Sequence, residues 1–186
     1  MKFLVSIVGD RDVKEGDAKY DKAFRIPRAL VDHGYRIVTG GIGSMAKVVY
    51  KGARTSSHYR EGVVLSIVPG FDPSVARGSS DIQIATGLDE YRNLIVANSD
   101  AIVAIGGGAG TLSEIALAWS LKRLIICMRV DGWSGRLAGK KVDERIRYPE
   151  IRDDQCFPAD NEDDVLDILS RNLPVYCKRH QGIPTD

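Results

Sequence analysis

The sequence lacks any apolar run that approaches the roughly 18 to 20 residues of a membrane-spanning helix. It also lacks a signal-peptide pattern, because Met1 leads directly into a strand-like segment. Neither charge sign dominates, since 26 basic and 25 acidic residues nearly cancel and no long block of one sign occurs. These absences argue against a membrane or a nucleic acid as a partner. We therefore expect a cytoplasmic protein whose ligand is a small molecule.

Cysteine is also scarce. The chain has three cysteines, Cys127, Cys156 and Cys177, which are far apart and show no metal-ligand spacing. This argues against a disulfide framework and against a zinc site, so we expect reduced thiols and no metal held by the chain. With 186 residues, of which 44% are hydrophobic and 27% charged, the sequence suits one globular domain with a sizeable core. We expect residues 1–186 to form that single domain.

Short apolar runs rich in β-branched residues alternate with longer segments of helical periodicity along the chain. The strand-like runs cover residues 3–9, 36–41, 63–70, 101–108 and 124–128. The helical segments cover residues 18–34, 45–56, 88–99 and 111–122. Continuous apolar strands that alternate with helices predict a parallel sheet covered on both faces. The predicted fold class is therefore α/β, a doubly wound, mainly parallel sheet of the Rossmann-like type with three α/β/α layers.

Several further features refine this prediction. Pro27 lies inside the first helical segment, where it is expected to kink the helix or make it start again. Residues 82–86 suggest a short extra strand, and residues 160–173 predict a last helix with acidic residues at its start. The tail at residues 178–186 is expected to be loose. Trp119 continues an apolar helix pattern, which assigns it to the core or to a dimer face.

Four glycines, Gly106, Gly107, Gly108 and Gly110, separate an apolar strand from the next helical segment. A strand, a glycine turn and a helix in this order point free backbone N–H groups at one spot, where the helix dipole also favours negative charge. Glycine is needed because a phosphate approaches the backbone closely and the turn can require a positive φ. The alternative is that some of these glycines only permit a tight turn and close packing. We predict a phosphate-binding loop.

A second loop of the same kind contains Gly40, Gly41 and Gly43, again between a strand and a helical segment. Gly41, Gly43 and Ala46 match the dinucleotide fingerprint G-x-G-x-x-A, which expects an acidic residue about 20 positions on, at the end of the next strand. Glu61 has this separation but precedes the strand, so a standard dinucleotide site is disfavoured. The sequence contains no G-x-x-x-x-G-K-[ST] string, which argues against a P-loop triphosphatase.

The two glycine loops predict one shared ligand crevice. In the strand order 3-2-1-4-5, the strand ending at Gly9 neighbours the strand ending at Gly106, and their loops diverge at the topological switch point. Residues 9–12, with the sequence GDRD and including Gly9 and Asp10, would form the other lip of that crevice, with Asp10 suited to a hydroxyl or an amine of the ligand. The alternative for Asp10 is a solvated turn residue. The expected ligand carries one phosphate and a further polar body.

The string GGGAGTLSEIALA at residues 106–118, together with residues 38–53 and 91–105, resembles the LOG-like proteins and especially their molybdenum-cofactor-carrier-like branch. The best-known motif of this superfamily is P-G-G-x-G-T-x-x-E. The chain has glycine in place of the motif's proline and supplies the other residues as Gly107, Gly108, Gly110, Thr111 and Glu114. The resemblance covers residues 1 to about 140 and implies a homodimer or a larger homo-oligomer.

The resemblance implies one of two functions. Hydrolases of the group are nucleoside 5′-monophosphate phosphoribohydrolases, which release a base from ribose 5-phosphate, whereas the carrier branch holds molybdenum cofactor. The hydrolases pair an arginine functionally with the motif glutamate, and a lysine follows that arginine. Aligned without gaps, the chain has Tyr91 at the arginine position and Arg92 at the lysine position, which favours the carrier-like branch. A shift of one residue would return Arg92 to the arginine's role.

Beside the glycine loops, the candidates for ligand contact are Arg92, Asn93 and Glu114. Glu114 suits contacts to a ribose or stabilisation of an oxocarbenium-like ribose, or it forms a T-x-x-E capping box with Thr111. Arg92 suits a clamp on phosphate or ribose, or it is a surface arginine paired with nearby acidic residues. Asn93 either reads a base edge or solvates its helix. Trp133 lies in a glycine-rich loop that is a candidate lid over the site.

Two functions from different classes are therefore predicted. The first is a binding or carrier protein for a phosphorylated, nucleotide-like small molecule, with no required cofactor and with molybdenum cofactor as a candidate bound ligand. The second is a phosphoribohydrolase in which Glu114 and Arg92 are catalytic, so the sequence leaves open whether the protein is an enzyme. A nicotinamide-dinucleotide protein is a weaker third alternative, because Glu61 is misplaced for it.

Overall fold

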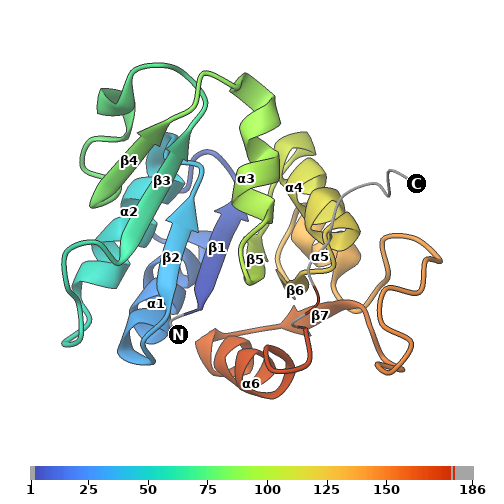
Figure 1. The fold of residues 1–186 in the computed structure, drawn as a ribbon. Helices are drawn as coiled ribbons and strands as arrows, with labels where there is room; N and C mark the ends of the chain where they lie inside the picture. The colour runs from blue at the N-terminus through green and yellow to red at the C-terminus, as the bar shows by residue number, and fades with distance from the viewer. Residues whose placement is uncertain (1–2, 177, 179–186) are drawn as a thin grey trace.

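A computed structural model of the chain describes residues 3–176 and residue 178, so the predictions for Cys177 and for residues 179–186 of the tail lie outside the described residues. Seven strands form one sheet in the order β4-β3-β2-β1-β5-β6-β7, and every neighbouring pair is parallel (Figure 1). The strands are β1 Leu4–Gly9, β2 Arg36–Thr39, β3 Val64–Val68, β4 Ile82–Ala85, β5 Ala101–Ile105, β6 Leu124–Met128 and β7 Cys156–Ala159.

Helices cover both faces of this sheet (Figure 1). On one face lie α1 Ala18–Asp32, α2 Gly43–Arg54 and α6 Glu162–Asn172, and on the other lie α3 Asn93–Ala97, α4 Ala109–Ser120 and α5 Trp133–Leu137. Two short 3-10 helices, Pro73–Ala76 and Asp89–Arg92, complete the described elements. This confirms the predicted three-layer, doubly wound α/β class. Over the described residues, no helix combines the length and the apolar character that crossing a membrane requires.

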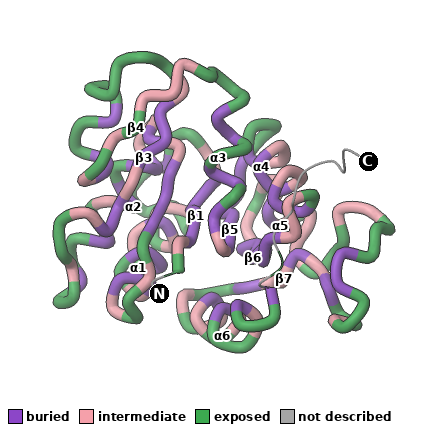
Figure 2. The backbone as a smooth tube through the Cα atoms, in the orientation of Figure 1, coloured by how far each residue is buried: buried purple, intermediate pink, exposed green. Residues whose placement is uncertain are grey.

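The sheet has a separate apolar core on each face, because neighbouring residues of a strand point to opposite sides. In β5, Ala101, Val103 and Ile105 pack into the core beneath α1, α2 and α6, whereas Ile102 and Ala104 pack into the core beneath α3 and α4. All five side chains are fully buried, and Figure 2 shows the central strands as the most buried part of the chain. The apolar sequence of a central parallel strand follows from burial on both sides.

The structure confirms two of the finer predictions and corrects a third. Residues 82–85 form the edge strand β4, and Asn161 caps α6 through a hydrogen bond that its side chain accepts from the backbone N–H of Asp164. Helix α1 does not restart at Pro27, because it runs unbroken from Ala18 to Asp32. Pro27 is buried with Ile26 in the helix's packed face, and this packing offsets the missing backbone hydrogen bond.

Trp119 belongs to the core and not to an exposed dimer face. Its side chain is buried, its indole N–H donates a hydrogen bond to Asp143 at 2.8 Å, and the guanidinium carbon of Arg147 lies 3.7 Å from the ring centroid. Helix α5 and strand β7 were not predicted. Strand β7 contains Pro158, which suits an edge strand and breaks the continuous apolar run that marks the central strands.

Candidate functional site

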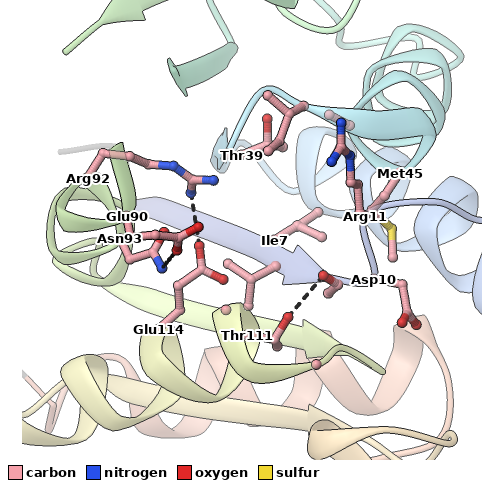
Figure 3. Close-up of a pocket in the computed structure, with 17 residues that line it drawn as sticks. Ile7, Asp10, Arg11, Thr39, Met45, Glu90, Arg92, Asn93, Thr111 and Glu114 are labelled. Carbon is pink, nitrogen blue, oxygen red and sulfur yellow. Dashed lines mark hydrogen bonds and ion pairs between the residues drawn. The ribbon is translucent and has the colours of Figure 1, made fainter. Parts of the chain in front are cut away.

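The sequence-predicted site residues gather at the carboxyl edge of the sheet, where β1 lies between β2 and β5. A cavity of about 290 Å³ opens there (Figure 3). The glycine loop after β2 and the glycine loop after β5 both contribute to its wall, as predicted for a shared crevice. The predicted residues that line it are Gly9, Asp10, Gly40, Arg92, Asn93, Gly108, Gly110, Thr111 and Glu114.

Three predicted glycines, Gly41, Gly43 and Gly107, are not part of this lining. All three have positive φ, at 72°, 79° and 92°. A Cβ at Gly43 would lie 2.0 Å from the carbonyl oxygen of Arg11, and a Cβ at Gly107 would lie 2.2 Å from the hydroxyl of Thr111. These glycines therefore shape the two turns, and for Gly107 this is the packing role that the sequence left open as the alternative.

The amino terminus of α4 presents free backbone donors to the cavity. Gly108 is the N-cap and provides no side-chain cap, and the first amide bonded within the helix is that of Leu112, which donates to the Gly108 carbonyl at 3.0 Å. Among the described residues, nothing accepts a hydrogen bond from the N–H groups of residues 109, 110 and 111. The helix dipole adds partial positive charge at the same point, so the arrangement favours an anion.

The amino terminus of α2 differs, because protein groups already accept from two of its first three amides. Asp12 accepts from the Ser44 N–H at 2.9 Å, and the carbonyl of Arg11 accepts from the Met45 N–H at 3.2 Å. The Ser44 hydroxyl also bonds to the backbone of Val13. The loop that follows β1 therefore provides hydrogen-bond acceptors for the amino terminus of α2.

Arg92 and Glu114 form a buried ion pair that faces the cavity (Figure 3). Nη1 of Arg92 lies 3.1 Å from Oε1 of Glu114, and both side chains are about nine-tenths buried. The guanidinium lies against the backbone of Gly40, where a Cβ would stand 2.6 Å from Nη1. Among the described residues, Nε of Arg92 is buried without a hydrogen-bond partner. The pair thus joins the first glycine loop to α4, and the surface-arginine alternative for Arg92 is wrong.

Two sequence interpretations of this pair need correction. Thr111 and Glu114 form no capping box, because α4 begins at Ala109 and the Thr111 hydroxyl donates to the carbonyl of Gly9 at 2.9 Å. The gapless alignment placed Tyr91 at the hydrolase arginine position, but Tyr91 is 83% exposed and Arg92 is the residue that meets Glu114. Tyr91 and Arg92 are the last two residues of the short 3-10 helix before α3, and the first side chain is exposed while the second is buried.

Burial raises the pKa of Glu114 to about 7, and the nearby carboxylate of Glu90 contributes in the same direction. The guanidinium of Arg92 opposes this increase, since a neighbouring cation favours the ionised carboxylate. The Glu114 carboxyl group therefore changes its protonation state near neutral pH. A carboxyl group with this property can accept or donate a proton at a bound ligand, or it can remain neutral and donate a hydrogen bond.

Asn93 and Asp10 are held in place by neighbours. The amide nitrogen of Asn93 donates to Ser113 at 2.8 Å and to Glu90 at 3.2 Å, so Asn93 is fixed and does not merely solvate its helix. Asp10 accepts from the ammonium of Lys19 at 2.6 Å and is only partly exposed, which makes the solvated-turn alternative wrong. Both residues line the cavity.

The sequence predicts residues 9–12 as one lip of the cavity but gives Arg11 no role of its own, and it does not single out Ser134. The Arg11 side chain lines the cavity mouth (Figure 3), but its position follows from the closure of the β1 loop on α2 and not from a motif. Ser134 lies behind the second glycine loop and accepts a hydrogen bond from the Gly106 N–H at 2.7 Å. The neighbouring Trp133 is not among the residues that line the cavity, so its segment supports the loop and does not cover the site.

The described residues include no group of three or more histidine, cysteine, aspartate or glutamate side chains placed to hold a metal ion. Cys127 and Cys156 are free thiols and are buried in the core, away from the cavity lining. The polar groups that the cavity offers are the backbone donors of α4, the Arg92–Glu114 pair and the polar side chains at the rim.

The fold and cavity define the class of the protein as a doubly wound α/β protein with its ligand cleft at the carboxyl ends of the central strands. The chain belongs to the SLOG cluster4 family, whose model matches residues 2–155. This family assignment agrees with the resemblance to the LOG-like proteins.

An uncharacterized protein of Archaeoglobus fulgidus is 32% identical over 120 residues, which cover 63% of this chain and 75% of that protein. The structure of TM1055, a structural-genomics target, is 26% identical and aligns with a TM-score of 0.75 over 92% of this chain and 99% of its own.

Two further solved structures share the fold at lower identity. The molybdenum cofactor binding protein of Rippkaea orientalis is 23% identical with a TM-score of 0.71, and the alignment covers 92% of this chain and 97% of that one. The molybdenum cofactor carrier protein of Chlamydomonas reinhardtii is 22% identical with a TM-score of 0.71, over 94% of this chain and 99% of its own.

Proposed function

We propose that this protein binds a phosphorylated small molecule in the cavity between β1, β2 and β5, and that it acts as a carrier or binding protein. The observation that carries the proposal is the free amino terminus of α4, whose first three amides have no acceptor among the described residues and adjoin the cavity. A phosphate oxygen supplies the acceptors that these donors lack, and the helix dipole stabilises its negative charge.

The remaining wall of the cavity suits a polar body attached to that phosphate. Ile7, Ile42 and Met45 provide apolar surface, while Asn93 and the Arg92–Glu114 pair provide polar groups at one end. The combination of apolar walls and a few placed polar groups is typical of small-molecule sites. The volume of about 290 Å³ fits a compact ligand or the phosphate-bearing part of a larger one.

Molybdenum cofactor is the candidate ligand, because the family resemblance implies it and because two proteins of the same fold are described as binding or carrying it. The described residues lining the cavity include no cysteine or histidine. The chain would therefore hold such a cofactor through its phosphate and its polar edge, as cargo, and not through thiolate or imidazole bonds to the metal. The proposal requires no cofactor for the protein's own fold.

The test places a fixed charge where the anion is expected. Gly108→Asp puts a carboxylate at the N-cap of α4, and no atom lies within 4 Å of the position of the new Cβ. We expect the variant to fold, to gain roughly a few tenths of a kcal/mol in stability from the cap, and to bind phosphate at least about tenfold more weakly than wild type. Isothermal titration with inorganic phosphate and with AMP and GMP measures the affinity.

The matched control is Gly108→Asn, which has the same size and also caps the helix but carries no charge. We expect its phosphate affinity to fall less than that of Gly108→Asp. Equal affinity for phosphate in wild type and in a folded Gly108→Asp protein would refute the proposed anion site.

A phosphoribohydrolase is the second candidate function, and the Arg92–Glu114 contact favours it. The resemblance assigns the hydrolases a functional pairing of an arginine with this glutamate, and Arg92 makes that contact at 3.1 Å. In such an enzyme Glu114 would stabilise the positive charge that develops on ribose as the base leaves. Release of free base and ribose 5-phosphate from AMP by wild type, lost in both Glu114→Gln and Arg92→Ala, would establish hydrolysis over carriage.

We also propose that two copies associate through an apolar face on α3 and α4. Tyr91, Leu94 and Ile95 are exposed there, beside a groove of about 650 Å³. This groove shares Glu90, Asn93 and Gly110 with the ligand cavity, so a second copy seated on it would also border the ligand site. Light scattering at several protein concentrations measures the molar mass of the protein in solution.

The single domain over residues 1–186 and the cytoplasmic location stay predictions.

A further inference from the structure

The turn between β5 and α4 adopts a backbone that few residues allow. Gly106 and Gly107 have φ values of 70° and 92°, which lie in the left-handed region. A Cβ at Gly106 would stand 2.3 Å from Oδ2 of Asp10 and 3.0 Å from the carbonyl oxygen of Asp131. Two successive glycines have wide conformational freedom, so something outside the turn must select this one conformation.

Residues 133 and 134 supply that selection through three hydrogen bonds. The Ser134 hydroxyl accepts from the Gly106 N–H at 2.7 Å, while the Ser134 N–H donates to the Gly106 carbonyl at 3.0 Å. The Trp133 N–H donates to the Gly107 carbonyl at 2.9 Å. The same Ser134 hydroxyl donates to the carbonyl of Met128 at 2.8 Å, which ties the turn to the end of β6. Ser134 is fully buried.

The departure of this chain from the P-G-G motif explains why such a tie is needed. Proline holds φ near −65° and has no N–H, so a proline at position 106 could neither adopt the observed φ of 70° nor donate to Ser134. Glycine at this position removes the rigidity that a proline ring provides. The hydrogen bonds from residues 133 and 134 restrict the turn instead.

We propose that Ser134 is a positioning residue for the anion site: by fixing Gly106 and Gly107 it aims the free amides of α4 at one point in the cavity. Ser134 touches no ligand itself, because it lies behind the turn and is not part of the cavity lining. This inference rests on the proposed function, since it concerns the phosphate that the α4 terminus is proposed to bind. A preorganised set of donors binds more tightly because less freedom is lost on binding.

The experiment compares Ser134→Ala with Ser6→Ala. Ser6 is also fully buried, and its hydroxyl bonds to Val96 and Ser99, but it belongs to strand β1 and has no hydrogen bond to the glycine turn. Inorganic phosphate is titrated calorimetrically into each folded protein at a temperature well below its unfolding midpoint. We expect Ser134→Ala to bind phosphate roughly tenfold more weakly than wild type and Ser6→Ala to bind within about twofold of wild type, whatever stability each has lost.

Amide hydrogen exchange at Gly106 provides a readout that does not depend on the ligand. Loss of the buried acceptor should speed exchange of the Gly106 N–H in Ser134→Ala and leave it unchanged in Ser6→Ala. Ser134→Cys, which keeps the shape of the side chain with a larger atom that hydrogen-bonds weakly, should show intermediate affinity and intermediate exchange, and it serves as the test if Ser134→Ala does not fold.

The possible outcomes separate the two proposals. If wild type binds no phosphate, the proposed function fails and this inference falls with it. If wild type binds phosphate and Ser134→Ala binds it equally well while Gly106 exchanges faster, the anion site stands and the positioning role of Ser134 is wrong. Equal loss of affinity in Ser134→Ala and Ser6→Ala would also overturn it, because the effect would then be one of general stability.

Discussion

The two glycine loops look alike in sequence but differ at the helix that each begins. Both join a parallel strand to a helix at the same edge of the sheet, and both border one cavity. The first amides of α2 donate to Asp12 and to the carbonyl of Arg11, whereas those of α4 have no acceptor among the described residues. An anion site therefore depends on unused donors at the helix terminus and not on the number of glycines before it.

The glycines themselves show the same division of roles. In the first loop, Gly41 and Gly43 leave no room for a Cβ, because Ser66 and Arg11 lie against them. In the second loop, Gly108 and Gly110 face open space, with no atom within 4 Å of where a Cβ would be. Gly41 and Gly43 therefore serve close packing, as Gly106 and Gly107 do at the start of the second loop, whereas Gly108 and Gly110 keep space free for a ligand. Arg92 and Glu114 join the two loops, since Arg92 lies on Gly40 and Glu114 belongs to α4.

The largest difference between the loops should appear in stability. Gly43→Ala places a Cβ 2.0 Å from a backbone carbonyl at a φ of 79°, so we expect a loss of about 3 kcal/mol or more in the free energy of unfolding. Gly110→Ala places a Cβ in open space within the first turn of a helix and should change stability by no more than about 1 kcal/mol, in the favourable direction. Urea denaturation measures both. Similar losses in the two variants would remove the distinction between glycines that serve packing and glycines that leave space for a ligand.

The pair that joins the loops should give stability a pH dependence. The pKa of Glu114 is about 7 in the folded protein and 4.5 as a free side chain, so the folded state retains a proton that the unfolded state releases. This contribution is fully present below about pH 4.5 and is lost as pH rises through 7, on the order of 3 kcal/mol in total. Glu114→Gln removes the titration. The difference in unfolding free energy between wild type and variant, measured by urea denaturation from pH 4.5 to 8, should therefore change with pH in this sense.

Parallel stability curves for wild type and Glu114→Gln over that range would show that the carboxyl titrates in the folded protein as it does in the unfolded chain. Arg92→Lys is the complementary variant, because lysine keeps the cation but loses the planar fork. Arg92→Lys should change the pH dependence of the unfolding free energy less than Glu114→Gln does.

The smallest effects on stability and on phosphate affinity are expected at Asp12, which accepts from the amino terminus of α2. Asp12→Ala removes the acceptor of the Ser44 N–H and should cost about 1 kcal/mol in stability, as loss of a helix cap does. Phosphate affinity should remain within about twofold of wild type, because the anion is proposed to lie at α4. Asp12→Asn keeps an acceptor and should retain most of the stability. A large gain in phosphate binding by Asp12→Ala would mean that α2 becomes a second anion site once it is uncovered.

Most of the fold could be predicted because its signals are local. Each signal predicts the secondary structure of its own segment: the apolar runs, the helical spacing of residues 18–34 and 111–122, and the acidic start of the last helix. The alternation of these segments then selects a parallel sheet, and β1 beside β5 follows from the common strand order. Strand β7 and helix α5 escaped prediction because their short sequences carry no such period.

The candidate site could be predicted only as a set of residue types near two loops. By itself the sequence determined the glycine turns, the strand ends that bring them together, and the presence of an arginine and a glutamate nearby. The tertiary structure decided which groups meet: Asp12 closes α2 from 32 residues away, Arg92 reaches Glu114 across 22 residues, and Ser134 holds Gly106 across 28 residues. The physical reason is that a local sequence pattern determines backbone conformation. Whether a hydrogen-bond donor finds an acceptor depends instead on which residues, distant in the sequence, the fold places next to it.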